Sequence, residues 1–201
     1  NENINVIDFP EASKKKLLET YKSDLNVDEL VSNYTKSKKE NTRTLYPFQD
    51  TAIKEFESNN YRHFFEMATG TGKTFTAINA IKRLDKEKPY VIILVPQIDL
   101  QIQWERELRK EGFNNIYLFG GNSIGDWKEE LFKSMIENHQ SKMVISVVVY
   151  DTYFQKIYKE IKTTNVLVVV DEAHNISRNQ FKLLSDQFKY RLGLSATPEK
   201  H

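Results

Sequence analysis

The chain has 201 residues, with 29 Lys and Arg against 28 Asp and Glu, so its formal net charge is +1. This balance argues against a uniformly basic nucleic-acid binder, but it leaves a local basic face open because the field follows the charge distribution. The lack of cysteine excludes disulfides and cysteine-based zinc sites and fits the cytoplasm. With short apolar runs and no signal-peptide pattern, we expect no membrane partner.

Residues 1–44 are predicted to form a helical extension and linker ahead of a single compact domain over residues 45–201. The lysine-rich patches of this extension are more typical of solvated helix faces than of nucleic-acid contacts. Because the chain begins with Asn rather than Met, we expect it to be a segment of a longer protein.

Strand and helix patterns alternate along the compact part. Apolar β-forming runs predict buried strands, and apolar residues at helical spacing predict amphipathic helices between them. The predicted strands are a run entering Met67, then Pro89–Pro96, Ile116–Phe119, Met143–Val149, Val166–Val170 and Tyr190–Leu194. The predicted helices are Pro47 to about Asn59, one opening at Phe75, Ile98–Lys110, Asp126–Glu137, Thr152–Ile161 and Asn179–Phe188. This alternation predicts an α/β fold with a doubly wound, mostly parallel sheet covered by helices on both faces.

Gln49 lies near the start of the first of these helices. Its carboxamide can donate and accept a hydrogen bond at once, which suits an adenine edge. A surface glutamine with no ligand is the alternative interpretation, and the position of Gln49 ahead of a glycine-rich turn is what favours the adenine role.

A phosphate-binding loop is predicted at the stretch Ala68-Thr69-Gly70-Thr71-Gly72-Lys73-Thr74, between a strand and a helix. Gly70 and Gly72 let the backbone take unusual dihedrals close to phosphate oxygens. Successive N–H groups and the positive helix end face the anion. Lys73 can reach the β and γ phosphates and Thr74 can ligate Mg²⁺. The first position of the motif usually holds a small residue, whereas this chain has Met67.

Two adjacent acids, Asp171 and Glu172, follow the most apolar strand, at the sheet edge where functional groups collect. The first carboxylate can hold Mg²⁺ opposite the phosphate loop, and the second can deprotonate the attacking water. A polar strand end that caps the next helix is the alternative, but the upstream phosphate loop favours an NTP hydrolysis site. His174 has no His or Cys cluster around it, so zinc is not expected. We expect His174 to bond toward Ser195-Ala196-Thr197, whose hydroxyls can sense the γ-phosphate.

These motifs, in this order, resemble those of superfamily 2 helicases. The matching stretches are Tyr46–Gln49, Ala68–Thr74, Val95–Leu100, Asp171–His174 and Leu194–Pro198, which look like the Q motif and motifs I, Ia, II and III. The branch that includes type III restriction enzyme helicase subunits and DEAD/DEAH-box relatives is the most similar. The resemblance implies a RecA-like first motor domain that binds ATP and Mg²⁺ and contacts a nucleic-acid backbone, DNA more than RNA.

The resemblance also implies a role for each matching residue. Gln49 would read adenine, Thr69 to Thr74 would hold the phosphates, Lys73 and Glu172 would be catalytic, and Thr74 and Asp171 would hold the metal. His174, Ser195 and Thr197 would couple hydrolysis to movement. Nucleic acid would be contacted by Pro96, Gln97, Gly120, Gly121 and Thr152. DEAD-box relatives carry an arginine two residues after the motif Ia proline, where this chain has Ile98.

An arginine finger in this family comes from a second RecA-like domain, which we expect in the parent protein, with a fused nuclease or recognition domain as a further partner. Without that domain we expect nucleotide binding, slow hydrolysis and no unwinding. Two other functions stay open. A regulatory ATP-binding module would dock a partner without translocating, and an unrelated P-loop enzyme such as a small-molecule kinase would need an acceptor lid and an arginine cluster that the sequence lacks.

Overall fold

The computed structural model describes residues 43–84, 88–120, 127–139 and 143–196. The predicted extension over residues 1–44 therefore lies almost wholly outside the described residues, as do Gly121, Asp126 and Thr197. None of the helices in the described part is long and apolar enough to cross a membrane.

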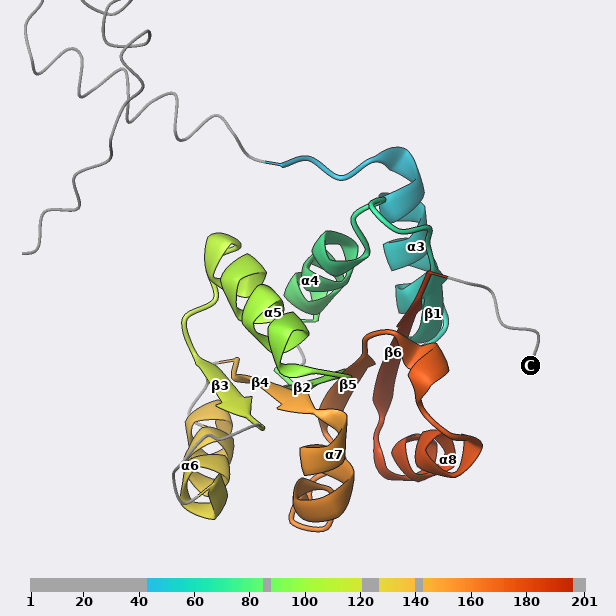
Figure 1. Cartoon of the computed structure of the whole chain (residues 1–201). Coiled ribbons are helices and arrows are strands. Elements are labelled where there is room, and N and C mark those ends of the chain that lie inside the picture. The colour runs from blue at the N-terminus through green and yellow to red at the C-terminus, as the bar shows by residue number, and fades with distance from the viewer. Residues whose placement is uncertain (1–42, 85–87, 121–126, 140–142, 197–201) are drawn as a thin grey trace, which may run out of the picture. The chain divides into compact units, whose positions relative to one another are not determined.

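The described strands form one six-stranded sheet in which every pairing is parallel (Figure 1). The strands are β1 (Arg62–Glu66), β2 (Tyr90–Val95), β3 (Ile116–Phe119), β4 (Ile145–Val149), β5 (Val166–Val170) and β6 (Tyr190–Ser195). Their order across the sheet is β1-β6-β5-β2-β4-β3. The predicted α/β fold with a parallel sheet is confirmed.

Helices cover both faces of this sheet. Alternate residues along a strand pack into two hydrophobic cores, the first core on one face and the second core on the other. One face carries α3 (Pro47–Ser58), α4 (Lys73–Arg83) and α5 (Ile98–Lys110), and the other carries α6 (Trp127–His139), α7 (Tyr150–Thr152) and α8 (Arg178–Gln187) (Figure 1). In β2, Ile93 packs toward the first core and Ile92 toward the second. Burial on both faces explains why the strands read as unbroken apolar runs.

The helix predicted over Thr152–Ile161 differs in the structure. The chain turns helical earlier, at Tyr150, and continues as a π-helical segment over Tyr153–Ile157 before ending in a turn. Tyr158 N donates to Tyr153 O at 3.0 Å, a bond five residues back that widens the turn by one residue. Tyr153 and Ile157 are both buried in the second core, and the widened turn places them there.

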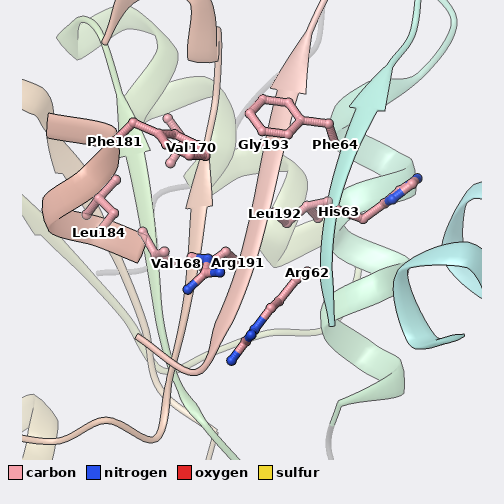
Figure 2. A pocket seen from close by; sticks show the side chains of 10 residues that line it. All are labelled: Arg62, His63, Phe64, Val168, Val170, Phe181, Leu184, Arg191, Leu192 and Gly193. Atoms are coloured by element: carbon pink, nitrogen blue, oxygen red, sulfur yellow. The ribbon is translucent and has the colours of Figure 1, made fainter. Parts of the chain in front are cut away.

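A cavity of about 210 Å³ lies on the α8 face of the sheet, lined by residues of β1, β5, β6 and α8 (Figure 2). Phe64 from β1 lies across Gly193 of β6 and stacks on Phe181 of α8, with ring centroids 5.9 Å apart. A Cβ built on Gly193 would stand 2.2 Å from the Phe64 ring. Gly193 is therefore required for this ring to rest on the sheet.

Gly193→Ala is expected to lower the free energy of unfolding by about 1–3 kcal/mol, because the Phe64 ring must leave its place. Denaturant unfolding of the wild type, of Gly193→Ala, of Phe64→Ala and of Phe64→Ala/Gly193→Ala measures the effect. In the Phe64→Ala background the same glycine change should cost much less. Equal costs in both backgrounds would contradict the packing argument.

Candidate active site

The glycine-rich stretch forms a tight loop between β1 and α4. Gly70 and Gly72 have φ values of 81° and 87°, in the left-handed region that favours glycine, and Gly72 is the N-cap of α4. Thr71 closes the turn on Ala68 O through its N–H at 3.3 Å and its hydroxyl at 2.7 Å. These bonds within the loop shape it, and the N-terminus of α4 begins at its end, where backbone N–H groups favour an anion.

Lys73 is the first residue of α4, and its Nζ donates to Met67 O at 3.1 Å. The ammonium therefore lies back across the loop, where an incoming phosphate can replace the carbonyl. Met67 is buried in the first core, so its large side chain points away from the loop and only its backbone faces Lys73. This explains how the loop accommodates methionine at a position that usually holds a small residue.

Gln49 is buried at 2% exposure and joins α3 to the phosphate loop. Its Nε2 donates to Thr71 O at 2.9 Å, and its Oε1 accepts from Tyr46 N at 2.9 Å. A Cβ on Gly72 would stand 2.7 Å from that Nε2, so the glycine permits the close approach. The carboxamide predicted to read adenine thus supports the loop in this structure.

Asp171 and Glu172 follow β5, with Asp171 only 6% exposed. Asp171 Oδ2 accepts from Trp104 Nε1 at 2.7 Å, and Oδ1 accepts from Glu172 N at 3.0 Å. Burial raises the pKa of the Asp171 carboxyl; the bond from Trp104 opposes that shift, the Glu172 charge adds to it, and the Lys73 ammonium lowers it. The Lys73 ammonium is therefore close enough to the Asp171 carboxyl to favour its charged form.

Glu172 adopts a left-handed conformation, with φ 49° and ψ 52°, that is uncommon for a residue with a side chain. The Tyr150 hydroxyl donates to the carbonyls of both Asp171 and Glu172, the latter at 3.3 Å. Tyr150 thus ties the first turn after β4 to the acidic turn after β5. Such strained backbone persists where the surrounding structure holds it, and it is common at functional sites.

Trp104 and Tyr150 are the site residues that sequence reasoning missed. The sequence places Trp104 inside the predicted helix Ile98–Lys110 and Tyr150 two residues before the predicted nucleic-acid contact Thr152, and it indicates no site role for either residue. The available signal was chemical: a buried indole N–H or phenol usually finds a hydrogen-bond partner. Which partner it finds depends on the fold, because Trp104 and Asp171 lie 67 residues apart.

Tyr153 gives a matched contrast to Tyr150. Its hydroxyl is fully buried and has no hydrogen-bond partner among the residues that the structure describes. Removing an unsatisfied buried polar group relieves a desolvation cost, so Tyr153→Phe is expected to raise the free energy of unfolding by about 1 kcal/mol. Tyr150→Phe removes a satisfied hydroxyl and should lower it by a similar amount. Denaturant unfolding of both variants tests the pair, and effects of the same sign would contradict this argument.

His174 lies between the acidic turn and the end of β6. Its Nδ1 is 3.4 Å from Ser195 Oγ and 3.5 Å from Glu172 Oε2. Ser195 O in turn accepts from Met67 N at 3.0 Å, so β6 contacts the start of the phosphate loop. The structure brings His174, Ser195, Glu172 and the loop together, while Thr197 lies outside the described residues.

The candidate nucleic-acid residues lie on the other half of the same sheet edge. Pro96 and Gln97 follow β2, Gly120 follows β3, and Thr152 follows β4. A Cβ on Gly120 would meet Val149 Cγ2 at 2.6 Å and Thr152 Oγ1 at 3.5 Å, so the strand ends pack closely there. The candidate nucleotide residues of the phosphate loop, of the acidic pair and at Ser195 lie at the carboxyl ends of β1, β5 and β6. The strand order β1-β6-β5-β2-β4-β3 therefore divides the edge into two halves.

Within the described ranges there is no group of three or more His, Asp or Glu side chains that could hold a metal by itself. Magnesium does not require such a cage, since it commonly takes one or two protein ligands beside substrate phosphates and water. The Thr74 hydroxyl and the Asp171 carboxylate are a donor set of that kind.

Comparisons with known proteins agree with this geometry. A DNA 3'-5' translocase XPB2 from Sulfurisphaera tokodaii is 29% identical over 158 residues, 78% of this chain and 31% of the relative. A nuclease-deletion mutant of the Type ISP restriction-modification enzyme LlaGI, solved with a DNA substrate mimic, aligns with TM-score 0.61 at 24% identity, over 79% of this chain and 18% of that one. The Sulfolobus solfataricus SWI2/SNF2 ATPase core with dsDNA aligns with TM-score 0.57 at 21% identity, over 78% and 32%.

The chain thus spans about a third or less of these proteins, and the solved structures support the fold. The family model described as "Type III restriction enzyme, res subunit" matches residues 15–200, nearly the whole chain. The predicted resemblance to superfamily 2 helicases is therefore confirmed, and the chain belongs to the family of type III restriction enzyme res subunits, with the fold of a first RecA-like motor domain.

Proposed function

We propose that this domain is the ATP-binding half of a nucleic-acid-dependent ATPase, a helicase or a duplex translocase. Hydrolysis of ATP would drive movement along nucleic acid once the domain pairs with a second RecA-like domain of the parent protein. The observation that carries the proposal is geometric: the glycine-rich loop with Lys73 follows β1 and bonds to the end of β6, and the buried Asp171 with Glu172 follows the next strand, β5, at the same edge of the sheet. These are the parts that phosphoryl transfer needs.

The nucleotide is assigned to the α4 end of the site. Gln49 would contact adenine as well as the loop, and Lys73 would stabilise the charge that develops on the transferred phosphoryl group. The loop N–H groups and the helix N-terminus would hold the phosphates. The phosphate-binding set is Thr69, Gly70, Thr71, Gly72, Lys73 and Thr74.

Magnesium fits the donors that this chain offers. Asp171 is a buried carboxyl whose burial raises its pKa, and a divalent cation beside it would favour the charged form. Thr74 would supply a second oxygen ligand from the first turn of α4. When bound, the ion neutralises phosphate charge; Asp171 and Thr74 hold it in place.

Glu172 is proposed as the general base that orients and deprotonates the attacking water. Its left-handed backbone is held by the hydrogen bond from Tyr150, and its carboxylate Oε2 lies 3.5 Å from His174 Nδ1. His174 and Ser195, in contact with each other, would pass the state of the nucleotide to the end of β6 together with Thr197.

Nucleic acid is assigned to the half of the sheet edge formed by β2, β4 and β3. Pro96, Gln97, Gly120, Gly121 and Thr152 are the proposed contacts, and they would bind the backbone rather than read bases. The names of the relatives, a DNA translocase and enzymes solved with DNA, support DNA as the track. A fused nuclease or recognition domain would be a further partner, and we propose a cytoplasmic location.

The ATPase rate of the full-length parent protein tests the proposal, measured alone and with single-stranded DNA, duplex DNA and RNA. We expect stimulation by DNA, a loss of stimulation with added salt, and indifference to sequence. Stimulation by RNA alone would assign RNA, rather than DNA, as the nucleic acid along which the protein moves. Tight ATP binding with no stimulated turnover would replace the motor by a regulatory ATP-binding module that docks a partner.

A further inference from the structure

Trp104 lies at the middle of α5 with 1% of its surface exposed, and the only polar atom of its side chain, the indole Nε1, faces the candidate active site. The indole Nε1–H donates to Asp171 Oδ2 at 2.7 Å, from a helix that packs on the first face of the sheet. Asp171 follows β5 on the same sheet, so this bond spans two elements that are distant in sequence.

The bond fixes the direction of the Asp171 carboxylate. Its other oxygen, Oδ1, accepts from Glu172 N at 3.0 Å, so each oxygen is held by one donor from a different side. With both oxygens held, rotation about the bond to the carboxylate would break a charge-assisted hydrogen bond, which is stronger than a neutral one. Each oxygen keeps a lone pair that a cation can use.

Core packing alone would not require tryptophan at this position. Leu108, one turn further along α5, is fully buried in the same cluster without any polar atom. A buried indole needs an acceptor for its N–H, and the acceptor here is the proposed metal ligand rather than a backbone carbonyl. The helix is itself fixed to the sheet by Gln101, whose Nε2 donates to Phe119 O at 3.1 Å and to Val147 O at 2.7 Å.

We propose that Trp104 is a positioning residue for the magnesium site, which acts by holding the Asp171 carboxylate in the orientation that binds the ion. This inference rests on the proposed function, because it takes Asp171 as the metal ligand. Trp104 contacts neither nucleotide nor metal in this assignment, and its effect passes entirely through Asp171. Outer-shell donors of this kind change metal affinity by about 10–100-fold when they are removed.

Trp104→Phe tests the proposal, because it keeps an aromatic ring in the core and removes the N–H. In the full-length parent protein, the Mg²⁺ concentration that half-saturates binding of a fluorescent ATP analogue is expected to rise about 10–100-fold. Binding at saturating Mg²⁺ should return to the wild-type level. Leu108→Ala is the matched control: it removes packing from the same helix face, and it should lower stability without changing the Mg²⁺ requirement.

A spectroscopic measurement separates positioning from packing. The chain contains two tryptophans, so Trp127→Phe leaves Trp104 as the only source of an indole N–H signal in the 201-residue chain. The ¹⁵N–¹H resonance of that indole is expected to shift when Mg²⁺ and nucleotide are added together. It should also shift in Asp171→Asn without any ligand, because the acceptor changes from a charged oxygen to a neutral amide.

The outcomes are distinguishable. Two results together would overturn the positioning role and leave the proposed function unaffected. The first is an unchanged Mg²⁺ requirement in a folded Trp104→Phe protein. The second is an indole resonance that shifts neither when Mg²⁺ and nucleotide are added nor in Asp171→Asn. Failure of the wild-type protein to bind the ATP analogue at any Mg²⁺ concentration would overturn both. An equal rise in the Mg²⁺ requirement for Leu108→Ala would assign the effect to packing and reject the hydrogen bond as its cause.

Discussion

Replacing Glu172 with Gln is expected to reduce the DNA-stimulated ATPase rate of the parent protein by about 10²–10⁴-fold, the usual contribution of a general base. The amide keeps the size of the side chain but cannot accept a proton. ATP affinity should change little, because the nucleotide is held by the loop and Asp171 rather than by Glu172. Steady-state turnover and equilibrium binding of a fluorescent ATP analogue, measured on the same preparation, separate the two effects.

The control for this variant is Glu129→Gln, the same substitution at an exposed position of α6. It should leave both turnover and binding at wild-type levels. A Glu172→Gln protein that hydrolyses ATP normally would remove Glu172 from the mechanism and require another base near the acidic turn.

Replacing Lys73 with Ala is expected to lower turnover by about 10²–10³-fold, the size found when one preorganised charge-stabilising donor is removed from a site. Unlike the change at Glu172, this one should also weaken ATP binding, because the ammonium would contact the phosphates in the bound state as well. The fold should tolerate the change, since the Lys73 side chain makes a single hydrogen bond within the described part of the chain, to Met67 O.

Lys82→Ala is the matched control, on the same helix but in a surface ion pair with Glu111. Its removal should cost little, as exposed pairs usually contribute about 0–1 kcal/mol. Retained ATP affinity in Lys73→Ala would show that the loop backbone alone binds the phosphates. The two lysines together therefore distinguish the loop chemistry from a general loss of positive charge on α4.

Much of the fold was predictable because each strand is buried on both faces and therefore reads as an apolar run with sharp ends. Val166–Val170 and Ile116–Phe119 have the predicted bounds, and so does the helix Ile98–Lys110. The segment after β4 was less predictable. Its π-helical turn results from placing Tyr153 and Ile157 in a core whose shape the local sequence does not encode.

Some residues of the candidate site could likewise be predicted from the sequence, and others could not. Glycine, lysine and paired acids report their chemistry by type and order, so the phosphate loop and Asp171–Glu172 could be named from the sequence. Residues that act by positioning other site residues could not be identified from the sequence. Trp104, Tyr150 and the loop contact of Gln49 depend on which elements the fold brings together. The roles assigned to the site residues stay predictions until the variants are measured.

The division of the sheet edge has a kinetic consequence. Residues after β1, β6 and β5 are assigned to nucleotide, and residues after β2, β4 and β3 to nucleic acid, with the boundary between two adjacent strands. Neither ligand would cover the entry of the other. On this assignment we expect either ligand to bind first, so that the ternary complex assembles in random rather than compulsory order.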